Sequence, residues 1–249
     1  MELEAGQRAR EYFHGLTVLP GAWTVIRVDG RSFSRLTEHH FDKPFDERFA
    51  ELMTGTAQAL LTDLGARYAY TQSDEISVLL APDHSLFGRG VEKLVSVSAG
   101  LASATFTHAG GVPAHFDSRI WVGTGPDDVA DYFAWRQADA MRNALSAWCY
   151  WTLRKAGRSA RATSEALAGT SVADRNQLLF EHGINVNDLP AWQRRGVGLW
   201  WETYPKTGFD PVRGTEVTAA RRRIRVEREL PLREEYRALV HRLAAPDGP

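Results

Sequence analysis

The order of apolar patterns in the first half of the chain limits the fold more than any other feature. Residues 22–30, AWTVIRVDG, form a β-rich run that ends at a glycine, and residues 46–63 carry apolar side chains at helical spacing. The order strand, helix, strand, strand, helix, strand predicts an α+β ferredoxin-like βαββαβ fold, with both helices on one face of an antiparallel sheet. The remaining four elements are predicted at residues 67–72, 76–81, 82–111 and 116–124.

After Pro126 the pattern becomes long, helical and aromatic, and it returns to extended runs only towards the C-terminus. A stretch near residue 220, ARRRIRVERE, is typical of a hairpin or an extended arm. No repeat, low-complexity segment or flexible linker separates the two halves. We therefore predict a sheet-based core at residues 1–125. Packed directly on it we predict a helical region with an extended C-terminal arm at residues 126–249.

Composition excludes several classes of protein. The single cysteine, Cys149, rules out an intramolecular disulfide and a zinc site built on several thiolates. The N-terminus lacks the apolar stretch of a signal peptide and no run is long enough to cross a bilayer, so we expect a soluble, cytoplasmic protein without membrane contact. A formal net charge of -1 argues against a histone-like binder, although local basic stretches fit contact with a folded RNA.

Acidic residues stand at two strand ends. Asp29 and Gly30 close the first strand, and Asp74 and Glu75 lie between the second and third strands. In a βαββαβ sheet these strands can be neighbours, which would place Asp29 beside Asp74. Two carboxylates that close repel each other unless a cation lies between them, and oxygen ligands without histidine suit Mg²⁺. Palm-type nucleotidyltransferases hold two ions in this way, which serve the attacking and leaving oxygens.

The residues after the first strand are suited to binding phosphate. Glycine permits close approach, and the turn that follows can present successive backbone N–H groups as an anion nest. Lys43, a few residues further on, would add a positive charge for terminal phosphates. Either acidic pair alone is more typical of a turn, and only their joint occurrence in this frame supports a metal site. The candidate phosphate-binding turn consists of Gly30, Arg31, Ser32, Phe33 and Ser34.

Several segments, spread over residues 8–202, resemble the tRNA-histidine guanylyltransferase family. This family and its relatives, the guanylyltransferase-like proteins, add nucleotides in the 3′-to-5′ direction. The resemblance implies a palm-like catalytic core, a helical region that helps to hold tRNA, and a homotetramer. The matching segments are IRVDGRSFSRLT, FDKPFDERF, YTQSDEISVLL, FDSRIWV, YFAWRQADAMRNAL and GTSVADRNQLLFEHGINVNDLPAWQRRGVGLWW.

The resemblance assigns roles to the acidic residues at the matching positions. Asp29 and Asp74 would be the carboxylates that bind Mg²⁺, two ions in all, and the Gly30 carbonyl would be an additional ligand. Glu75 would be a neighbouring acid that is important for activity, either as an indirect metal ligand or as a support of the hairpin.

The resemblance also implies the nucleotide site and the order of the reaction. The phosphate-binding turn, together with Lys43, Ser73 and the metal-binding carboxylates, would hold a nucleoside triphosphate. GTP and ATP are the implied substrates, and tRNA is the implied partner. ATP would activate a 5′-monophosphate end of the tRNA, and the 3′-hydroxyl of an incoming GTP would then attack the activated end.

One segment departs from the family pattern. Members that recognise the histidine tRNA carry His-Ile-Asn-Asn-Leu-Tyr where this chain has residues 141–146, MRNALS. This departure favours the guanylyltransferase-like branch, whose members repair 5′-truncated tRNAs by templated addition. Asn143, which the change leaves in place, is a predicted RNA contact. Arg175 and Asn176 occupy a position that is usually Lys-Asn in the family, and they are also predicted to contact RNA.

Two other functions remain open from the residues alone. A nucleotide cyclase uses the same kind of sheet and acidic pair, although it would not need the segments beyond residue 126. A non-catalytic RNA-binding module is the third possibility, and the intact set of Asp29, Asp74 and Glu75 argues against it. Arg221, Arg223 and Arg225 would share one face of an extended strand, where they could contact RNA phosphates or lie in solvent.

Overall fold

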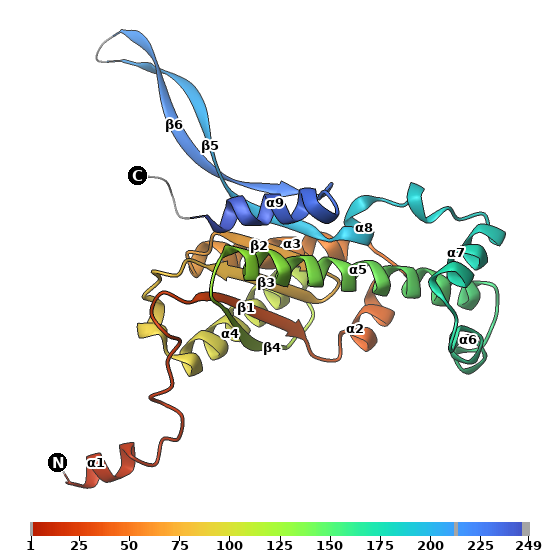
Figure 1. The fold of residues 1–249 in the computed structure, drawn as a ribbon, viewed down its shortest axis with the longest axis horizontal. Coiled ribbons are helices and arrows are strands. Elements are labelled where there is room, and N and C mark those ends of the chain that lie inside the picture. Colours follow the sequence, from red (N-terminus) through yellow and green to blue (C-terminus); the bar gives the residue numbers. More distant parts are fainter. Residues whose placement is uncertain (1, 212–213, 246–249) are drawn as a thin grey trace.

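The computed structural model describes residues 2–211 and 214–245, and it contains one six-stranded antiparallel sheet in the order β4-β1-β3-β2-β5-β6 (Figure 1). The strands are β1 (Trp23–Gly30), β2 (Tyr68–Gln72), β3 (Glu75–Leu80), β4 (Phe116–Gly123), β5 (Val197–Asp210) and β6 (Thr215–Glu227). The helices are α1 (Glu2–Arg8), α2 (Phe33–His40), α3 (Glu47–Asp63), α4 (Val91–Gly110), α5 (Pro126–Lys155), α6 (Ala160–Leu167), α7 (Val172–Glu181), α8 (Ala191–Arg195) and α9 (Arg233–Ala244), with 3-10 turns η1 (Leu86–Arg89) and η2 (Val186–Asp188).

The predicted ferredoxin-like core is confirmed. The order β4-β1-β3-β2 is the one that a βαββαβ chain produces, and the strand boundaries lie within one residue of those expected from the sequence. Asp46 caps α3, because its side chain accepts a hydrogen bond from the backbone N–H of Arg48. This core places the ends of β1 and of the β2–β3 hairpin at the same edge of the sheet.

The two faces of the sheet are covered by different helices, because side chains alternate along each strand. Ile26 and Val28 of β1 point into a core with α3 and α4. Trp23 and Val25 point the other way, into a second core with α5 and α9 (Figure 1). Asp29 follows the same alternation and therefore lies on the α5 side of the sheet. The 30-residue helix α5 thus forms a wall above the acidic ends of the strands.

The segment after β1 differs from the turn expected from the sequence. Gly30 ends the strand, and the short helix α2 begins only three residues later at Phe33. Ser32 makes the transition in the left-handed region, with φ 62°. Phe33 turns inward, is 2% exposed and packs against Phe116 at a ring-centroid distance of 4.8 Å. A Cβ on Gly30 would stand 2.4 Å from the Phe33 ring, so this packing itself requires glycine.

The C-terminal half contributes strands to the same sheet. β5 pairs with β2, and β6 pairs with β5 to form the hairpin that projects from the core in Figure 1. Its arginines are largely engaged within the hairpin: Arg223 contacts Glu202, and Arg225 contacts Glu227, each at 2.5 Å. The predicted division of the chain into a core at residues 1–125 and a helical region at residues 126–249 stays a prediction. Among the described residues, no helix is both long and apolar enough to span a bilayer.

Candidate active site

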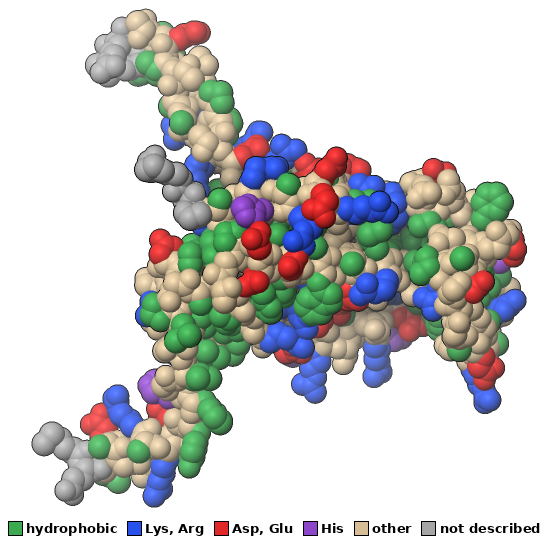
Figure 2. All heavy atoms as spheres, viewed as in Figure 1, with side chains coloured by type: hydrophobic (Ala, Val, Ile, Leu, Met, Phe, Trp, Pro, Cys, Tyr) green, Lys and Arg blue, Asp and Glu red, His purple; other side chains and the backbone are tan. Residues whose placement is uncertain are grey.

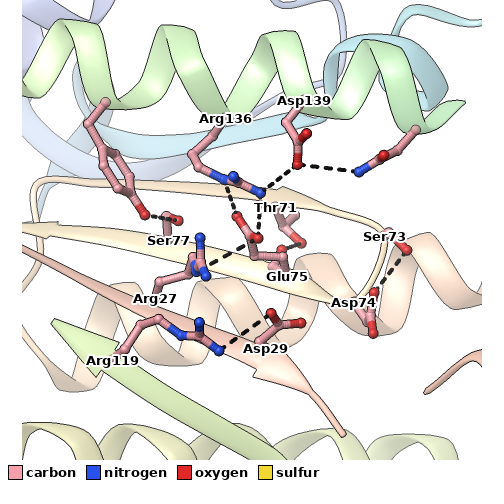
Figure 3. Close-up of polar contacts among 12 residues, drawn as sticks. Arg27, Asp29, Thr71, Ser73, Asp74, Glu75, Ser77, Arg119, Arg136 and Asp139 are labelled. Atoms are coloured by element: carbon pink, nitrogen blue, oxygen red, sulfur yellow. Dashed lines mark hydrogen bonds and ion pairs between the residues drawn. The ribbon is translucent and has the colours of Figure 1, made fainter. Parts of the chain in front are cut away.

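The β2–β3 hairpin presents Asp74 at the edge of the sheet. Gln72 and Glu75 are paired across the strands, which leaves Ser73 and Asp74 as a two-residue turn, with Ser73 at φ 53°. The backbone N–H of Gly30 donates to the carbonyl of Asp74 at 3.0 Å, so the turn is attached to the end of β1. The Ser73 hydroxyl donates to Oδ1 of Asp74 at 3.0 Å (Figure 3). The end of β1 and the β2–β3 turn, which the sequence predicts to lie together, are therefore joined by a backbone hydrogen bond.

Asp29 lies close to Asp74 and between two further carboxylates. It stands opposite Glu75 on β3 and opposite Asp117 on β4. Burial, reinforced by the charge of Asp29, raises the pKa of Asp74, and the Ser73 hydrogen bond opposes this rise. Within the described part of the chain, the one ion pair of Asp29 is with Arg119, at a long 3.9 Å. The pair therefore retains unneutralised negative charge at this edge.

Glu75 is engaged on the α5 side of the sheet. Its carboxylate accepts hydrogen bonds from Nε and from a terminal nitrogen of Arg136, each at 2.7 Å, and lies 3.8 Å from Nε of Arg27 (Figure 3). Burial raises the pKa of Glu75, and Arg136 and Arg27 work against that rise. Of the two roles left open for Glu75, this geometry supports the hairpin role, because both carboxylate oxygens are used by Arg136.

One cavity of about 880 Å³ connects most of the candidate residues. It lies between α2, α3, the β2–β3 turn and α5. Lys43 enters it from the loop before α3, donates to the Thr37 hydroxyl at 2.5 Å and stands 5.8 Å from the ring centre of Trp151. Burial lowers the pKa of Lys43, while the charges of Glu38 and Asp74 raise it. The predicted site residues that line this cavity are Asp29, Phe33, Ser34, Lys43, Ser73, Asp74, Glu75 and Asn143.

The predicted phosphate-binding turn is only partly available for a ligand. The backbone N–H of Gly30 is used by Asp74, and that of Arg31 donates to the carbonyl of His115 at 2.8 Å. The Ser32 side chain does not cap α2, so the N–H groups of the first helical turn, at Phe33 and Ser34, can bind an anion. The side chain of Phe33 is committed to the core. Nucleotide contact by Gly30–Ser34 stays a prediction.

The three residues predicted to contact RNA lie in different surroundings. Asn143 lines the cavity from α5 and donates to Asp139 at 3.4 Å. Arg175 donates to Ser146 Oγ at 2.6 Å and to Thr170 Oγ1 at 3.0 Å, so it fastens α7 to α5. Asn176 is exposed on α7 and bonds the carbonyl of Val172. The contact of these residues with RNA stays a prediction.

Sequence reasoning missed the basic and aromatic wall of the cavity. Arg136 and Asp139 come from α5; Arg136 bonds Glu75 on β3, 61 residues earlier in the chain, and also donates to Asp139. Trp135, half exposed and lying against the Arg136 guanidinium at 4.5 Å, and Trp151 also face the cavity. The signal in the sequence was the segment YFAWRQADAMRNAL, in which Arg136, Asp139 and Arg142 recur at helical spacing among apolar and aromatic residues.

The protein residues present fit a magnesium ion that is shared with a substrate. Asp29 and Asp74 offer carboxylate oxygens without a tightly bound arginine. Among residues 2–211 and 214–245, no group of three or more His, Cys, Asp or Glu side chains is arranged to hold a metal. Magnesium often takes one or two protein carboxylates and completes its octahedron with water and phosphate oxygens, and this arrangement allows it to do so.

A ferredoxin-like sheet with an acidic pair at one edge, beside a cavity that carries a lysine, is the arrangement of palm-type nucleotidyltransferases. The chain matches the family model for tRNAHis guanylyltransferase over residues 6–123 and the model for the Thg1 C terminal domain over residues 127–238. It therefore belongs to the tRNA(His) guanylyltransferase family.

Known relatives agree with this assignment along most of the chain. A probable tRNA(His) guanylyltransferase of Mus musculus is 33% identical over 229 residues, which cover 84% of this chain and 77% of the relative. A bacterial Thg1-like protein solved in complex with GTP is 29% identical, with a TM-score of 0.74 over 98% of this chain and 99% of that chain. The same kind of protein solved with ATP is 28% identical, with a TM-score of 0.75 and the same shares covered.

Proposed function

We propose that the protein adds nucleotides to the 5′ end of tRNA in the 3′-to-5′ direction, with GTP as the nucleotide donor and ATP for activation. The observation that carries this proposal is the meeting of Asp29 and Asp74 at one sheet edge, beside a cavity that holds Lys43. The names of the relatives support tRNA as the acceptor, and the solved complexes of the bacterial relatives support GTP and ATP as ligands. A nucleotide cyclase has no comparable support.

The chemistry requires positioning and charge neutralisation rather than a protein nucleophile. Activation joins AMP to the 5′-phosphate of the tRNA and releases pyrophosphate. The 3′-oxygen of GTP then forms a bond to that 5′-phosphorus, and AMP leaves with the bonding electron pair. Asp29 and Asp74 would hold Mg²⁺, which supplies positive charge to the attacking and leaving oxygens. Lys43 and the first turn of α2 would hold the triphosphate of the nucleotide.

The natural acceptor is proposed to include 5′-truncated tRNAs. The segment MRNALS at residues 141–146 lacks the histidine and the second asparagine of members that recognise the histidine tRNA. In the structure, Arg142 pairs with Asp139 and Ser146 accepts a bond from Arg175, so two of these positions serve contacts within the chain. This supports the proposal that the protein recognises its tRNA substrate by the missing 5′ nucleotide rather than by the anticodon.

The test is to incubate the purified protein with Mg²⁺, ATP, GTP and labelled tRNA. The acceptors are a histidine tRNA that lacks its extra 5′ guanosine and a second tRNA from which the first nucleotide is removed. Extension of the truncated tRNA by one templated nucleotide is the expected result. Extension of the histidine tRNA alone would refute the repair role, and formation of a cyclic product without extension of either acceptor would refute the whole proposal.

A further inference from the structure

Helix α2 separates two hollows and presents a different face to each. Ser34 and Thr37 lie on the side that lines the cavity of the acidic pair. Arg35 and His39 lie on the other side and line a second hollow of about 460 Å³. We call this second hollow the α2 groove, and its polar residues are Arg31, Ser32, Arg35, His39, His40 and His115. Arg35 and His39 are four residues apart in α2 and therefore share one face of the helix, and Arg31 lies just before the helix begins.

The arginines of the α2 groove differ from those around the cavity of the acidic pair. Arg136, Arg119 and Arg142 each lie within 3.1 Å of a carboxylate oxygen. Arg31 and Arg35 are exposed, and neither has an ion-pair partner within residues 2–211 and 214–245. A guanidinium that is not neutralised by its own chain is available to a phosphate, which it can bind through two parallel N–H bonds.

The α2 groove begins where the acidic site ends. Arg31 follows Gly30 directly, and its backbone N–H donates to the carbonyl of His115 at 2.8 Å, which fixes one wall of the groove to the end of β1. A strand that enters the acidic site at its 5′ end must continue over a neighbouring surface. Arg35 and His39 are separated by about 6 Å along α2, which matches about two phosphates of a strand that carries one charge per 3.4 Å.

We propose that the α2 groove binds the sugar-phosphate backbone of the substrate RNA next to its 5′ end. This inference rests on the proposed function, because it names the path of the same acceptor. Arginines bind the phosphates, and the imidazoles of His39, His40 and His115 donate hydrogen bonds to phosphate or 2′-hydroxyl oxygens. The nucleoside triphosphate would bind on the opposite side of α2, at Lys43. The RNA and the nucleotide would therefore not compete for the α2 groove.

The test is a comparison of RNA affinity and nucleotide affinity in the same variants. The double variant Arg35→Ala/His39→Ala is expected to bind a fluorescein-labelled 5′-truncated tRNA about tenfold more weakly, to raise KM for this tRNA by a similar factor, and to leave kcat and the Kd for GTP unchanged. The slope of log Kd against log salt is expected to become shallower by about 0.7 to 0.9, because one phosphate contact by an arginine is lost.

Two matched variants make the result specific. Arg35→Lys keeps the charge and is expected to retain most of the RNA affinity. Arg242→Ala removes an exposed arginine from α9, on the opposite face of the sheet, and is expected to change nothing. Unchanged RNA affinity in Arg35→Glu and in the double variant would overturn the proposal, and so would a loss of GTP affinity with RNA affinity intact. Failure of the proposed function can be told apart from failure of the groove proposal. In the first case the wild-type protein would bind the tRNA without extending it.

Discussion

Arg136 donates two hydrogen bonds of 2.7 Å to Glu75, and this pair joins the β2–β3 hairpin to α5 (Figure 3). The side chains of Arg136 and Glu75 are 10% and 15% exposed, so the charges are largely withdrawn from water. Glu75 directly follows Asp74 in the chain. The position of the acidic turn therefore depends on a contact between residues that are 61 positions apart.

Breaking this pair on one side is expected to destabilise the protein. Arg136→Met leaves the Glu75 carboxylate buried without its main partner and should lower the free energy of unfolding by about 3 kcal/mol, because an unpaired buried charge is costly. Replacing both residues, as Arg136→Met/Glu75→Leu, should recover part of the loss. Urea unfolding of the single and double variants measures this. Additive losses in the double variant would show that the two residues are not coupled.

Gly30→Ala is expected to damage stability through Phe33. The new methyl group would stand 2.4 Å from the Phe33 ring, which is packed among Phe49, Phe106 and Phe116. Displacement of this ring should cost about 1 to 3 kcal/mol, a usual range for overpacking. The additional change Phe33→Leu should restore part of the stability. Gly55→Ala in α3 is the matched control: nothing lies within 4 Å of its Cβ, so it should stabilise the helix by about 0.5 to 1 kcal/mol.

Asp46 is expected to make stability depend on acidic pH. Its hydrogen bonds with Arg48 lower the pKa of Asp46 from 3.8 to about 2. A carboxyl whose pKa is lower in the folded state stabilises the fold above its unfolded pKa. The contribution of about 2 kcal/mol is therefore present above pH 4 and is lost as the pH falls towards 2. Asp46→Asn should lower the free energy of unfolding at pH 7 but change it little at pH 2. Equal losses at both values would contradict this account.

Charge pairing on the surface is harder to predict from the sequence than the order of the strands. Charged side chains of both signs lie intermixed over the visible face of the core, including α5 and α9 (Figure 2). The apolar pattern predicted the βαββαβ order, in which the strands that carry Asp29 and Asp74 can be neighbours, and β1 does pair with β3, with Asp29 opposite Glu75. Which of the many charged residues pair with each other depends on helix packing, which no local pattern encodes.

The features that the sequence does not predict have the same physical origin. Phe33 is predicted as part of a polar turn, yet it starts a helix and fills the core, and Ser32 directly before it adopts a left-handed conformation that no local pattern predicts. Arg136 lies in a helix whose burial on the sheet face is set by α9 and β3 rather than by its own sequence. The role of Glu75 as a support of the hairpin follows only from this placement of α5.

Lys43 is expected to contribute mainly to nucleotide binding. Its ammonium group lies in the cavity between Thr37 and Trp151, and Lys43→Met would remove the positive charge without removing the aliphatic stem. KM for GTP should rise about 10- to 100-fold, with a smaller effect on KM for tRNA. Lys93→Met on the exposed side of α4 is the control and should leave both constants unchanged. Equal increases in both KM values would show that Lys43 does not discriminate between the two ligands.

Asp74 and Asp117 are expected to differ sharply in their importance for the reaction, although both lie at the same edge of the sheet. Asp117 contacts Arg119 at 3.1 Å and is already neutralised, whereas Asp74 accepts a hydrogen bond from the Ser73 hydroxyl and has no arginine partner among the described residues. Asp74→Ala should lower kcat for tRNA extension by about a thousandfold, because a required metal ligand contributes several kcal/mol to the transition state. Asp117→Ala should lower kcat only a few-fold.

Extension assays over a range of Mg²⁺ concentrations, together with thermal unfolding of each variant, separate loss of metal affinity from loss of folding. Near-normal activity of Asp74→Ala would remove Asp74 from the proposed metal site.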